Sequence, residues 1–262
     1  MEAEKISAAA AALLGAYSSG IPVAPLSGQY PGLTVDDAYA IQQAQVTAWT
    51  ADGAVVKGHK VGLTSAAMQR QLGVDQPDFG ALADSMFLPE GVTADYGKFL
   101  QPKAEPEIGF VLGKPLAGPG VTVAEALAAV DFVLPALEII DSRIADWKIS
   151  LADTVADNAS SGGVVLGGRP VKPDAVDLAL TGCLLHRNGR IEGTGAGGAV
   201  LGSPVNALVW LANTLGQRGV TLQAGHVILP GSVCAAIPFG PGDTVSATFD
   251  RIGSVSISFS GK

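Results

Sequence analysis

The ten residues KAEPEIGFVL, positions 103–112, have the alternation of a β-strand with two different faces. Successive side chains of a strand point to opposite sides, so Glu105 and Glu107 share one face while Ile108 and Phe110 share the other. The apolar face predicts burial in a sheet. The proline between the two glutamates has no N–H, which predicts an edge strand or a bulge at this point.

The elements around this strand change character along the chain. The first 72 residues favour helices, and the chain after about residue 86 favours short strands separated by Gly and Pro. Asn188-Gly189 predicts a hairpin, and Thr122 with Glu125 forms a capping box at the start of a helix. Helices are expected at 4–17, 35–49 (after an N-cap at Thr34), 65–72, 122–130 and 204–215 (stopped by Gly216), a loop at 73–80, and further strands at 54–63, 132–140 and 251–260.

Helices first and strands later indicate an α+β fold rather than regular βαβ winding. We expect a β-rich mixed-sheet core with N-terminal helices packed on it. We expect residues 1–80 to form an N-terminal helical segment with a lysine-bearing strand and residues 81–262 to form the β-rich core that would carry any metal-binding or catalytic site, the two making one cooperative unit.

Composition excludes several classes of protein. The 262 residues are 48% apolar and 15% charged, with 16 Lys and Arg against 24 Asp and Glu and a net charge of −8. This acidic balance argues against nucleic-acid binding and against a polybasic membrane-surface protein. Mean hydropathy is +0.35, yet no run reaches 18 apolar residues, so we expect a large core or a homo-oligomer interface.

The cysteines and the N-terminus bear on location. Cys183 and Cys234 lie far apart and form no CxxC, so a disulfide framework is excluded and a reduced cytoplasmic location is expected. The first five residues, MEAEK, do not have the charge pattern of a signal peptide.

Three carboxylates are expensive to place. Glu105 and Glu107 on one strand face repel each other unless a cation lies between them, although a solvated strand end is the plainer alternative. Glu138 lies in an apolar run, so it must be paired, protonated or bound to metal, and a salt bridge to Arg143 or Lys148 is an alternative. Because no Cys/His cluster is nearby, a metal bound by these acids would be Mg²⁺ or Mn²⁺ rather than zinc.

Two further groups are candidates for proton transfer or ligand binding. Lys60, in GHKVGLT at 58–64, is expected to be partly buried, and burial would lower its pKa toward acid–base use; the alternative is a surface lysine. Asp78 lies in the expected loop, where an acid is more often a turn-former. The small polar stretch 153–163 offers donors for an anionic ligand, or is a plain loop.

Other signals fail. GTGAGG at 193–198 matches a dinucleotide fingerprint, but it follows a hairpin and has no acid about 20 residues later. No GxSxG elbow or Cys/His nucleophile pair is present, and the three histidines lack metal-ligand spacing.

The blocks at 58–80, 103–116, 134–168 and 201–212 resemble, in the same order, the 2-keto-4-pentenoate hydratase family of the fumarylacetoacetate hydrolase superfamily. The long third block, LPALEIIDSRIADWKISLADTVADNASSGGVVLGG, is specific, whereas the E-x-E pair alone is weak. The family pattern commonly has a non-proline residue where this chain has Pro106, which puts the local strand geometry in question.

The resemblance implies roles for particular residues and a reaction. A divalent cation, Mg²⁺ or Mn²⁺, would be held by Glu105, Glu107 and Glu138; Lys60 and Asp78 would move protons; Leu63 and Ser160 would help to hold the substrate. The reaction implied is hydration of 2-hydroxypenta-2,4-dienoate to 4-hydroxy-2-oxopentanoate in meta-cleavage catabolism of aromatic or steroid rings, by a homo-oligomer that can associate with a neighbouring pathway enzyme.

Three alternatives remain open. A decarboxylase of 2-oxo-3-hexenedioate would use the same scaffold and the same chelated 2-oxo acid, although RIADWK at 143–148 looks more like the hydratase branch. An acylpyruvate hydrolase would need an activated water, and no extra His–Glu pair is present to supply it. A non-catalytic subunit would not need the full set of acids and Lys60.

Overall fold

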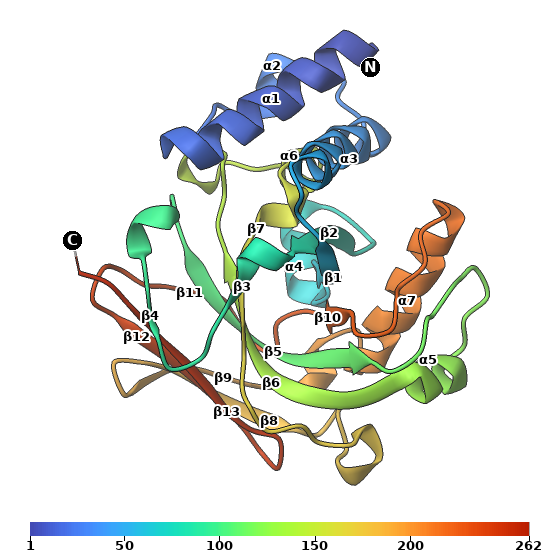
Figure 1. Ribbon diagram of the computed structural model, residues 1–262, viewed down its shortest axis with the longest axis vertical. Coiled ribbons are helices and arrows are strands. Elements are labelled where there is room, and N and C mark those ends of the chain that lie inside the picture. The colour runs from blue at the N-terminus through green and yellow to red at the C-terminus, as the bar shows by residue number, and fades with distance from the viewer. Residues whose placement is uncertain (262) are drawn as a thin grey trace.

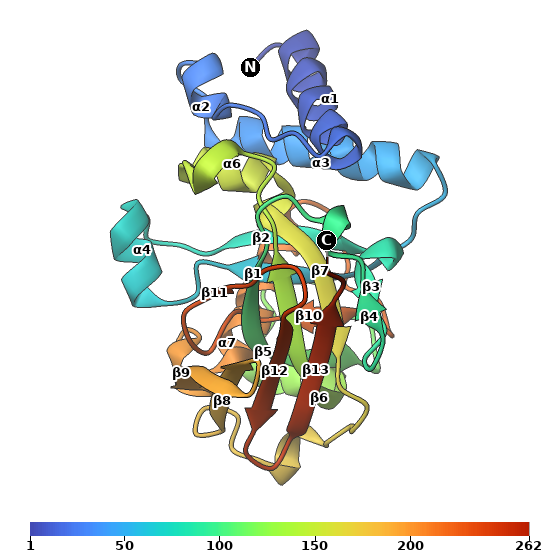
Figure 2. The ribbon, with the colours of Figure 1, turned by 90° about the vertical axis from the view of Figure 1, so that its left-hand side faces the viewer.

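Two β-sheets pack face to face below a layer of helices, as the two ribbon views show (Figures 1 and 2). The computed structural model describes residues 1–261, apart from the side chains of Met68, Gln71 and Leu72. The larger sheet has the strand order β2-β1-β10-β5-β6-β7-β3, with β11 also paired to β5, and the smaller has the order β4-β13-β12-β8-β9. Helices α1, α2, α3 and α6 lie together at one end of the sheets, so the expected α+β class is confirmed.

The bounds of the elements are as follows. The α-helices are α1 (Ala3–Ser19), α2 (Leu26–Gln29), α3 (Val35–Ala51), α4 (Ala66–Leu72), α5 (Val123–Ala129), α6 (Leu151–Ala156) and α7 (Pro204–Gln217). The strands are β1 (Val56–Gly62), β2 (Asp78–Ala83), β3 (Phe87–Leu88), β4 (Thr93–Ala94), β5 (Lys103–Leu112), β6 (Val130–Ile140), β7 (Ser161–Leu166), β8 (Gly182–Arg187), β9 (Arg190–Ala196), β10 (Val227–Leu229), β11 (Ile237–Pro238), β12 (Thr244–Phe249) and β13 (Gly253–Phe259). Short 3-10 helices are η1 (Asp84–Met86), η2 (Tyr96–Lys98), η3 (Ala145–Trp147), η4 (Asn158–Ser160), η5 (Pro173–Ala175) and η6 (Gly197–Ala199).

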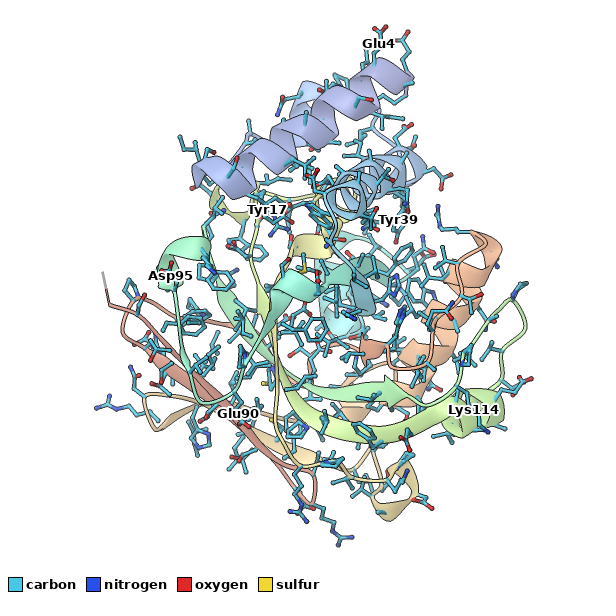
Figure 3. The ribbon with its side chains drawn as sticks, viewed as in Figure 1. Glu4, Tyr17, Tyr39, Glu90, Asp95 and Lys114 are labelled. Atoms are coloured by element: carbon cyan, nitrogen blue, oxygen red, sulfur yellow. The ribbon has the colours of Figure 1, made fainter. Side chains whose placement is uncertain are left out.

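Local sequence accounts for the helical layer. Thr34 caps α3 through a reciprocal capping box with Asp37, which satisfies N–H groups at the start of the helix. Tyr17 of α1 and Tyr39 of α3 lie on the side of the layer that faces the sheets (Figure 3). Tyr39 stacks on Phe79 of β2 with ring centroids 4.4 Å apart, which fixes α3 over the strand that carries Asp78.

Strand β5 lies inside the larger sheet, so the expectation of an edge strand is wrong. It pairs with β6 along its whole length, and its other side pairs with β10 at Phe110 and with β11 at Ala104. Between those two contacts the ladder is interrupted, and the carbonyl of Pro106 accepts a hydrogen bond from the N–H of Val233 at 3.1 Å. Because the N and the C=O of one strand residue point to the same side, Pro106 lacks its N–H where no strand needs it.

Other boundaries also differ from expectation. The region expected as a loop at 73–80 ends in β2, which begins at Asp78 and pairs antiparallel with β1. The boundary expected at residue 80 therefore falls within a strand of the larger sheet. Helix α7 runs to Gln217 rather than stopping at Gly216. Over residues 1–261, no helix combines the length and apolarity needed to cross a membrane.

Candidate active site

Three carboxylates meet on one face of the β5–β6 ladder. Glu105 and Glu138 are direct cross-strand partners, and Glu107 lies two residues further along β5, opposite Ala136. One carboxylate oxygen of each glutamate lies within 4.8 Å of the other two. Glu107 and Glu138 are fully buried. The alternation that placed Glu105 and Glu107 on one face is confirmed, and the prediction that Glu138 joins them is confirmed as geometry.

Burial makes this cluster costly to charge. It raises the pKa of Glu105 to about 7, against the attraction of Lys60 and with added repulsion from Glu138. The pKa of Glu107 is raised well above its usual range, first by burial and then by repulsion from the other two glutamates. Glu107 Oε1 and Glu138 Oε2 are buried without a hydrogen-bond partner. A site of buried, unpartnered carboxylate oxygens has the donor set that a hard divalent cation prefers.

Backbone geometry fixes Glu107. Its Oε2 accepts a hydrogen bond of 2.7 Å from the N–H of Gly231. Gly231 has a φ of +118°, and a Cβ there would collide with the side chain of Thr64. Only glycine meets both conditions, so this residue sets one carboxylate oxygen and leaves the other, Oε1, open to the cluster.

Lys60 reaches the cluster from the neighbouring part of the sheet. Its Nζ lies 3.4 Å from Glu138 Oε1 and donates a hydrogen bond of 3.0 Å to the carbonyl of Ala159. Burial is the largest single cause and lowers its pKa, but the attractions of Glu138, Asp78, Glu105 and Glu107 together outweigh burial, so the net shift is upward. The expected burial is confirmed, and the expected lowering of the pKa is wrong because four carboxylates surround this lysine.

The alternative salt bridges for Glu138 are also wrong. Glu138 faces Lys60, whereas Arg143 pairs with Asp157 at 2.5 Å and Lys148 pairs with Asp146 at 2.9 Å. The sequence could not indicate Lys60 as the partner, because 78 residues separate it from Glu138 and only the sheet brings them together.

Asp78 completes the group and is no turn-former. It begins β2, is 2% exposed and lies opposite Gly62 in the β1–β2 ladder. Burial raises its pKa against the attraction of Lys60 and a hydrogen bond from the backbone of Gly62. Asp78 Oδ1 has no hydrogen-bond partner. A buried acid with a free oxygen beside an ammonium group can accept or return a proton.

Ser160 and Leu63, the two residues expected to contact the substrate, have different surroundings. The hydroxyl of Ser160 lies 3.3 Å from Asp157 Oδ2 and 3.2 Å from the hydroxyl of Thr154, so it is engaged inside the protein. Leu63 ends β1 with a φ of +56°, and its carbonyl accepts a hydrogen bond from Gln69. As substrate contacts, both residues stay predictions.

Ser161, which sequence reasoning missed, has a buried hydroxyl without a partner. That oxygen lies 3.0 Å from where a Cβ at Gly80 would stand, next to the strand that carries Asp78. Two adjacent serines in a small polar stretch carried no signal as to which hydroxyl is left free, because that depends on the turn preceding β7.

Comparison with known proteins identifies the family to which this chain belongs. The family model for the fumarylacetoacetate (FAA) hydrolase C-terminal region matches residues 56–259. A 2-keto-4-pentenoate hydratase from Paraburkholderia xenovorans is 49% identical over 251 residues, which cover 96% of this chain and 93% of the relative. The chain belongs to the fumarylacetoacetate hydrolase superfamily, in its 2-keto-4-pentenoate hydratase branch. The fold and family expected from the sequence are thereby confirmed.

Members of this superfamily share the fold while differing in reaction. A 2-oxo-hept-4-ene-1,7-dioate hydratase from Escherichia coli is 44% identical over 240 residues, covering 89% of this chain and 90% of that protein. The solved structure of 4-oxalocrotonate decarboxylase from Pseudomonas putida G7, complexed with magnesium and adipate, superposes with a TM-score of 0.96 at 38% identity, covering 99% of this chain and 98% of that one. The fold therefore does not separate hydration from decarboxylation, whereas sequence identity is higher to the hydratases.

Proposed function

We propose that this protein is a hydro-lyase that adds water to 2-hydroxypenta-2,4-dienoate and gives 4-hydroxy-2-oxopentanoate, in meta-cleavage catabolism of aromatic or steroid rings. The observation that carries the proposal is the convergence of Lys60, Asp78 and the three glutamates, all of them buried except Glu105, which is half-buried. The hydratase names of relatives 42–51% identical to this chain support the same reaction.

We further propose that Glu105, Glu107 and Glu138 hold Mg²⁺ or Mn²⁺. Their open oxygens and their raised pKa values support this, because a cation would relieve the charge that burial makes costly. When bound, such a cation supplies Lewis acidity for negative charge at the C2 oxygen of a 2-oxo acid.

The chain's own residues then account for the protons. In the assignment that we propose, Asp78 Oδ1 accepts the enol proton while Lys60 Nζ donates a proton to C5, which gives the 2-oxo-3-enoate. Lys60 Nζ next takes a proton from the water that adds at C4, and Asp78 returns its proton to C3. Both residues end as they began, and the net change is one water added. Ser160 and Leu63 are proposed to hold the substrate.

The test is an ultraviolet assay that follows loss of the dienol with and without Mg²⁺ or Mn²⁺. We expect metal-dependent loss of absorbance and formation of 4-hydroxy-2-oxopentanoate. No turnover of 2-hydroxydienoates of any tail length, in protein shown to bind the metal, would leave the non-catalytic subunit as the better reading.

One structural observation favours a second reaction. The near-complete superposition on 4-oxalocrotonate decarboxylase makes decarboxylation of 2-oxo-3-hexenedioate the leading alternative. Offering that substrate and measuring CO₂ separates the two, since hydration releases none. Release of pyruvate from an acylpyruvate would instead indicate a hydrolase.

We also propose that the protein is a cytoplasmic homo-oligomer that can associate with a neighbouring enzyme of its pathway. Exposed apolar side chains at Leu180, Leu184 and Ile191, around β8 and β9, support self-association. Light scattering after size-exclusion chromatography measures the mass, and a monomer at micromolar concentration would contradict assembly.

A further inference from the structure

A strained turn lies directly behind the lysine of the active site. Asn158, Ala159 and Ser160 follow α6 and have φ values of 51°, 50° and 53°, which is the left-handed region. This region is unfavourable for non-glycine residues, least so for asparagine, so three in succession persist only if the surrounding structure holds them.

This turn connects to both candidate proton-transfer strands. The carbonyl of Ala159 accepts the hydrogen bond from Lys60 Nζ, at 3.0 Å. The side chain of Asn158 makes two hydrogen bonds to the backbone of Ala81 in β2, at 2.8 and 2.9 Å. The carbonyl of Asn158 occupies the space that a Cβ at Gly80 would fill. A shift of the turn therefore moves the acceptor that fixes the Lys60 ammonium group.

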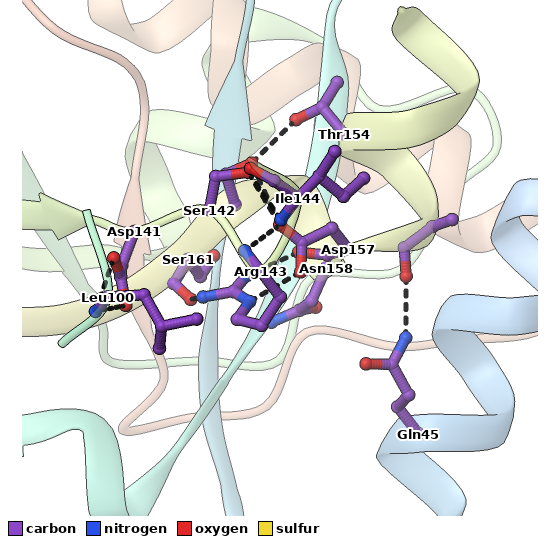
Figure 4. Close-up of polar contacts among 12 residues, drawn as sticks. Gln45, Leu100, Asp141, Ser142, Arg143, Ile144, Thr154, Asp157, Asn158 and Ser161 are labelled. Atoms are coloured by element: carbon purple, nitrogen blue, oxygen red, sulfur yellow. Dashed lines mark hydrogen bonds and ion pairs between the residues drawn. The ribbon is translucent and has the colours of Figure 1, made fainter. Parts of the chain in front are cut away.

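Arg143 bonds to residues on both ends of the turn (Figure 4). Its guanidinium donates to Asp157 Oδ1 at 2.5 Å, to the carbonyl of Asp157 at 2.7 Å and to the carbonyl of Ser161 at 2.8 Å. These acceptors flank the three left-handed residues on both sides. Asp157 Oδ2 also accepts from the backbone N–H of Arg143 at 3.0 Å. The fork thus fixes both ends of the turn at once, which an ammonium group cannot do.

Stability alone does not explain why the Arg143–Asp157 ion pair is buried at this position. Arg143 and Asp157 are both fully buried. A buried ion pair offers little net stability over apolar residues of similar volume, because both charges lose their hydration. Its geometry is the feature that apolar residues could not reproduce. The ring of Tyr17 in α1 lies 4.5 Å from the guanidinium carbon and covers it from the helical layer.

We propose that Arg143 and Asp157 are positioning residues for the reaction, acting through the 158–160 turn and the Ala159 carbonyl on the ammonium group of Lys60. This inference rests on the proposed function, because it takes Lys60 to transfer the proton. Within the described residues, the side-chain hydrogen bonds of Arg143 and Asp157 go to each other, to Ser142, to Ser160 and to the carbonyls of Asp157 and Ser161, and none goes directly to Lys60, Asp78 or the three glutamates. Because the turn also carries Ser160, which is proposed to hold the substrate and whose hydroxyl donates to Asp157, the loss of either residue should change KM slightly, lower kcat far more, and leave the affinity for metal almost unchanged.

The experiment uses Arg143→Lys, which keeps the charge and loses the fork. We expect kcat on 2-hydroxypenta-2,4-dienoate to fall about 10- to 100-fold, as misplacement of a catalytic group by an ångström does, with KM and the Mg²⁺ midpoint within about threefold of wild type.

The matched control is Asp153→Asn. Asp153 is also fully buried and bonded, to Ser27 and Ser150, but it does not contact the turn through its side chain. It should lower Tm and leave kcat within about twofold of wild type. Wild-type kcat in folded Arg143→Lys protein overturns the proposal. A fall of kcat in Asp153→Asn as large as the fall in Arg143→Lys overturns it as well, because the loss would then follow from general destabilisation.

Tyr17→Leu covers the case in which Arg143→Lys does not fold. It keeps an apolar side chain, although a smaller one, and removes the ring over the guanidinium, so kcat should fall about threefold or more with a smaller change in KM, and an unchanged kcat overturns the proposal. Failure of the proposed function is distinguishable from this, because wild-type protein and Asp153→Asn would then also lack turnover.

Discussion

The carboxylate of Asp78 occupies the space in which a side chain at Gly62 would begin. The two residues are partners in the β1–β2 ladder, and a Cβ at position 62 would collide with Asp78 Oδ1 and lie 3.4 Å from Lys60 Nζ. Because Gly62 has no side chain, the carboxylate of Asp78 and the ammonium group of Lys60 can lie close together.

Gly62→Ala should displace the Asp78 carboxylate while the sheet stays intact. Gly62 has no left-handed φ, so alanine fits its backbone and only the carboxylate must move. We expect kcat to fall about 10²-fold, the contribution typical of a positioned acid or base, with metal binding retained. Gly182→Ala, which meets no atom within 4 Å, is the control and should keep full activity. Equal activity of the two variants would remove Asp78 from the mechanism.

Lys60→Met should abolish turnover and retain the metal. Methionine fills the buried space, and removal of the cation next to Glu138 takes away a charge that repels a divalent ion. We therefore expect kcat to fall about 10²- to 10⁴-fold with equal or tighter Mg²⁺ binding by isothermal titration calorimetry. Lys172→Met, which removes an exposed lysine paired with Asp131, is the control. Wild-type turnover in Lys60→Met excludes the proposed proton transfer.

Glu107→Gln should weaken metal binding more than it weakens the fold. The amide oxygen can still accept the hydrogen bond from Gly231, so local structure survives while the charge is lost. We expect a loss of metal affinity of about 10-fold or more and a matching loss of activity. Glu192→Gln changes an acid paired with Arg187 outside the cluster and should change neither. Full activity of metal-stripped Glu107→Gln protein would end the metal hypothesis.

Added metal should stabilise the protein more at high pH than at low pH. Burial, with repulsion among the glutamates, raises the pKa of Glu105 to about 7, whereas an unfolded glutamate titrates near about 4.3. Between these values the metal-free folded state binds more protons, so its free energy of unfolding falls as pH rises.

A bound cation compensates the charges that appear in that window. We expect Mg²⁺ at about 100 times its Kd to add about 2.7 kcal/mol at pH 8, and less at pH 5.5, where protons compete. Thermal unfolding at the two pH values measures this, with Glu107→Gln as the variant that should lose the effect. A Mg²⁺-induced rise in Tm that is larger at pH 5.5 would contradict the assignment.

His59 should make the protein sensitive to acid. Burial first, and then repulsion from His226, lower its pKa to about 3, compared with about 6.5 when unfolded. Between these values the unfolded state binds more protons, so the free energy of unfolding falls with falling pH by up to about 1.4 kcal/mol per pH unit. His59→Gln should flatten this slope between pH 6.5 and pH 5 in urea titrations, and an unchanged slope would show that His59 is not the titrating group.

The site and the elements could be predicted from the sequence where the energetic cost of placing a residue depends on its near neighbours in the chain. Glu138 in an apolar strand and two glutamates on one face were expensive under any pairing, so their convergence on one site could be predicted. The helix at 35–51 and the hairpin at 188–189 carried caps and turn residues next to the elements they form.

The sequence did not predict ionic partners or pKa shifts that depend on segments far apart in the chain. Arg143 pairs with Asp157 rather than Glu138, and Lys60 gains a raised pKa from four acids, because the sheet assembles them across long separations. The turn at 158–160 has three left-handed residues and no glycine, and only Asn158 among them has a local preference for that conformation.

The acids and the lysine stand on β1, β2, β5 and β6, which are strands of one sheet, and not on the loops around its rim. Because main-chain hydrogen bonds between neighbouring strands hold these residues in register, the spacing of their Cα atoms does not depend on the conformation of a surface loop. Segments that make no contact with these strands can therefore change while the backbone positions of the acids and the lysine stay fixed, and the relatives include hydratases named for pentenoate, hexadienoate and heptenedioate substrates.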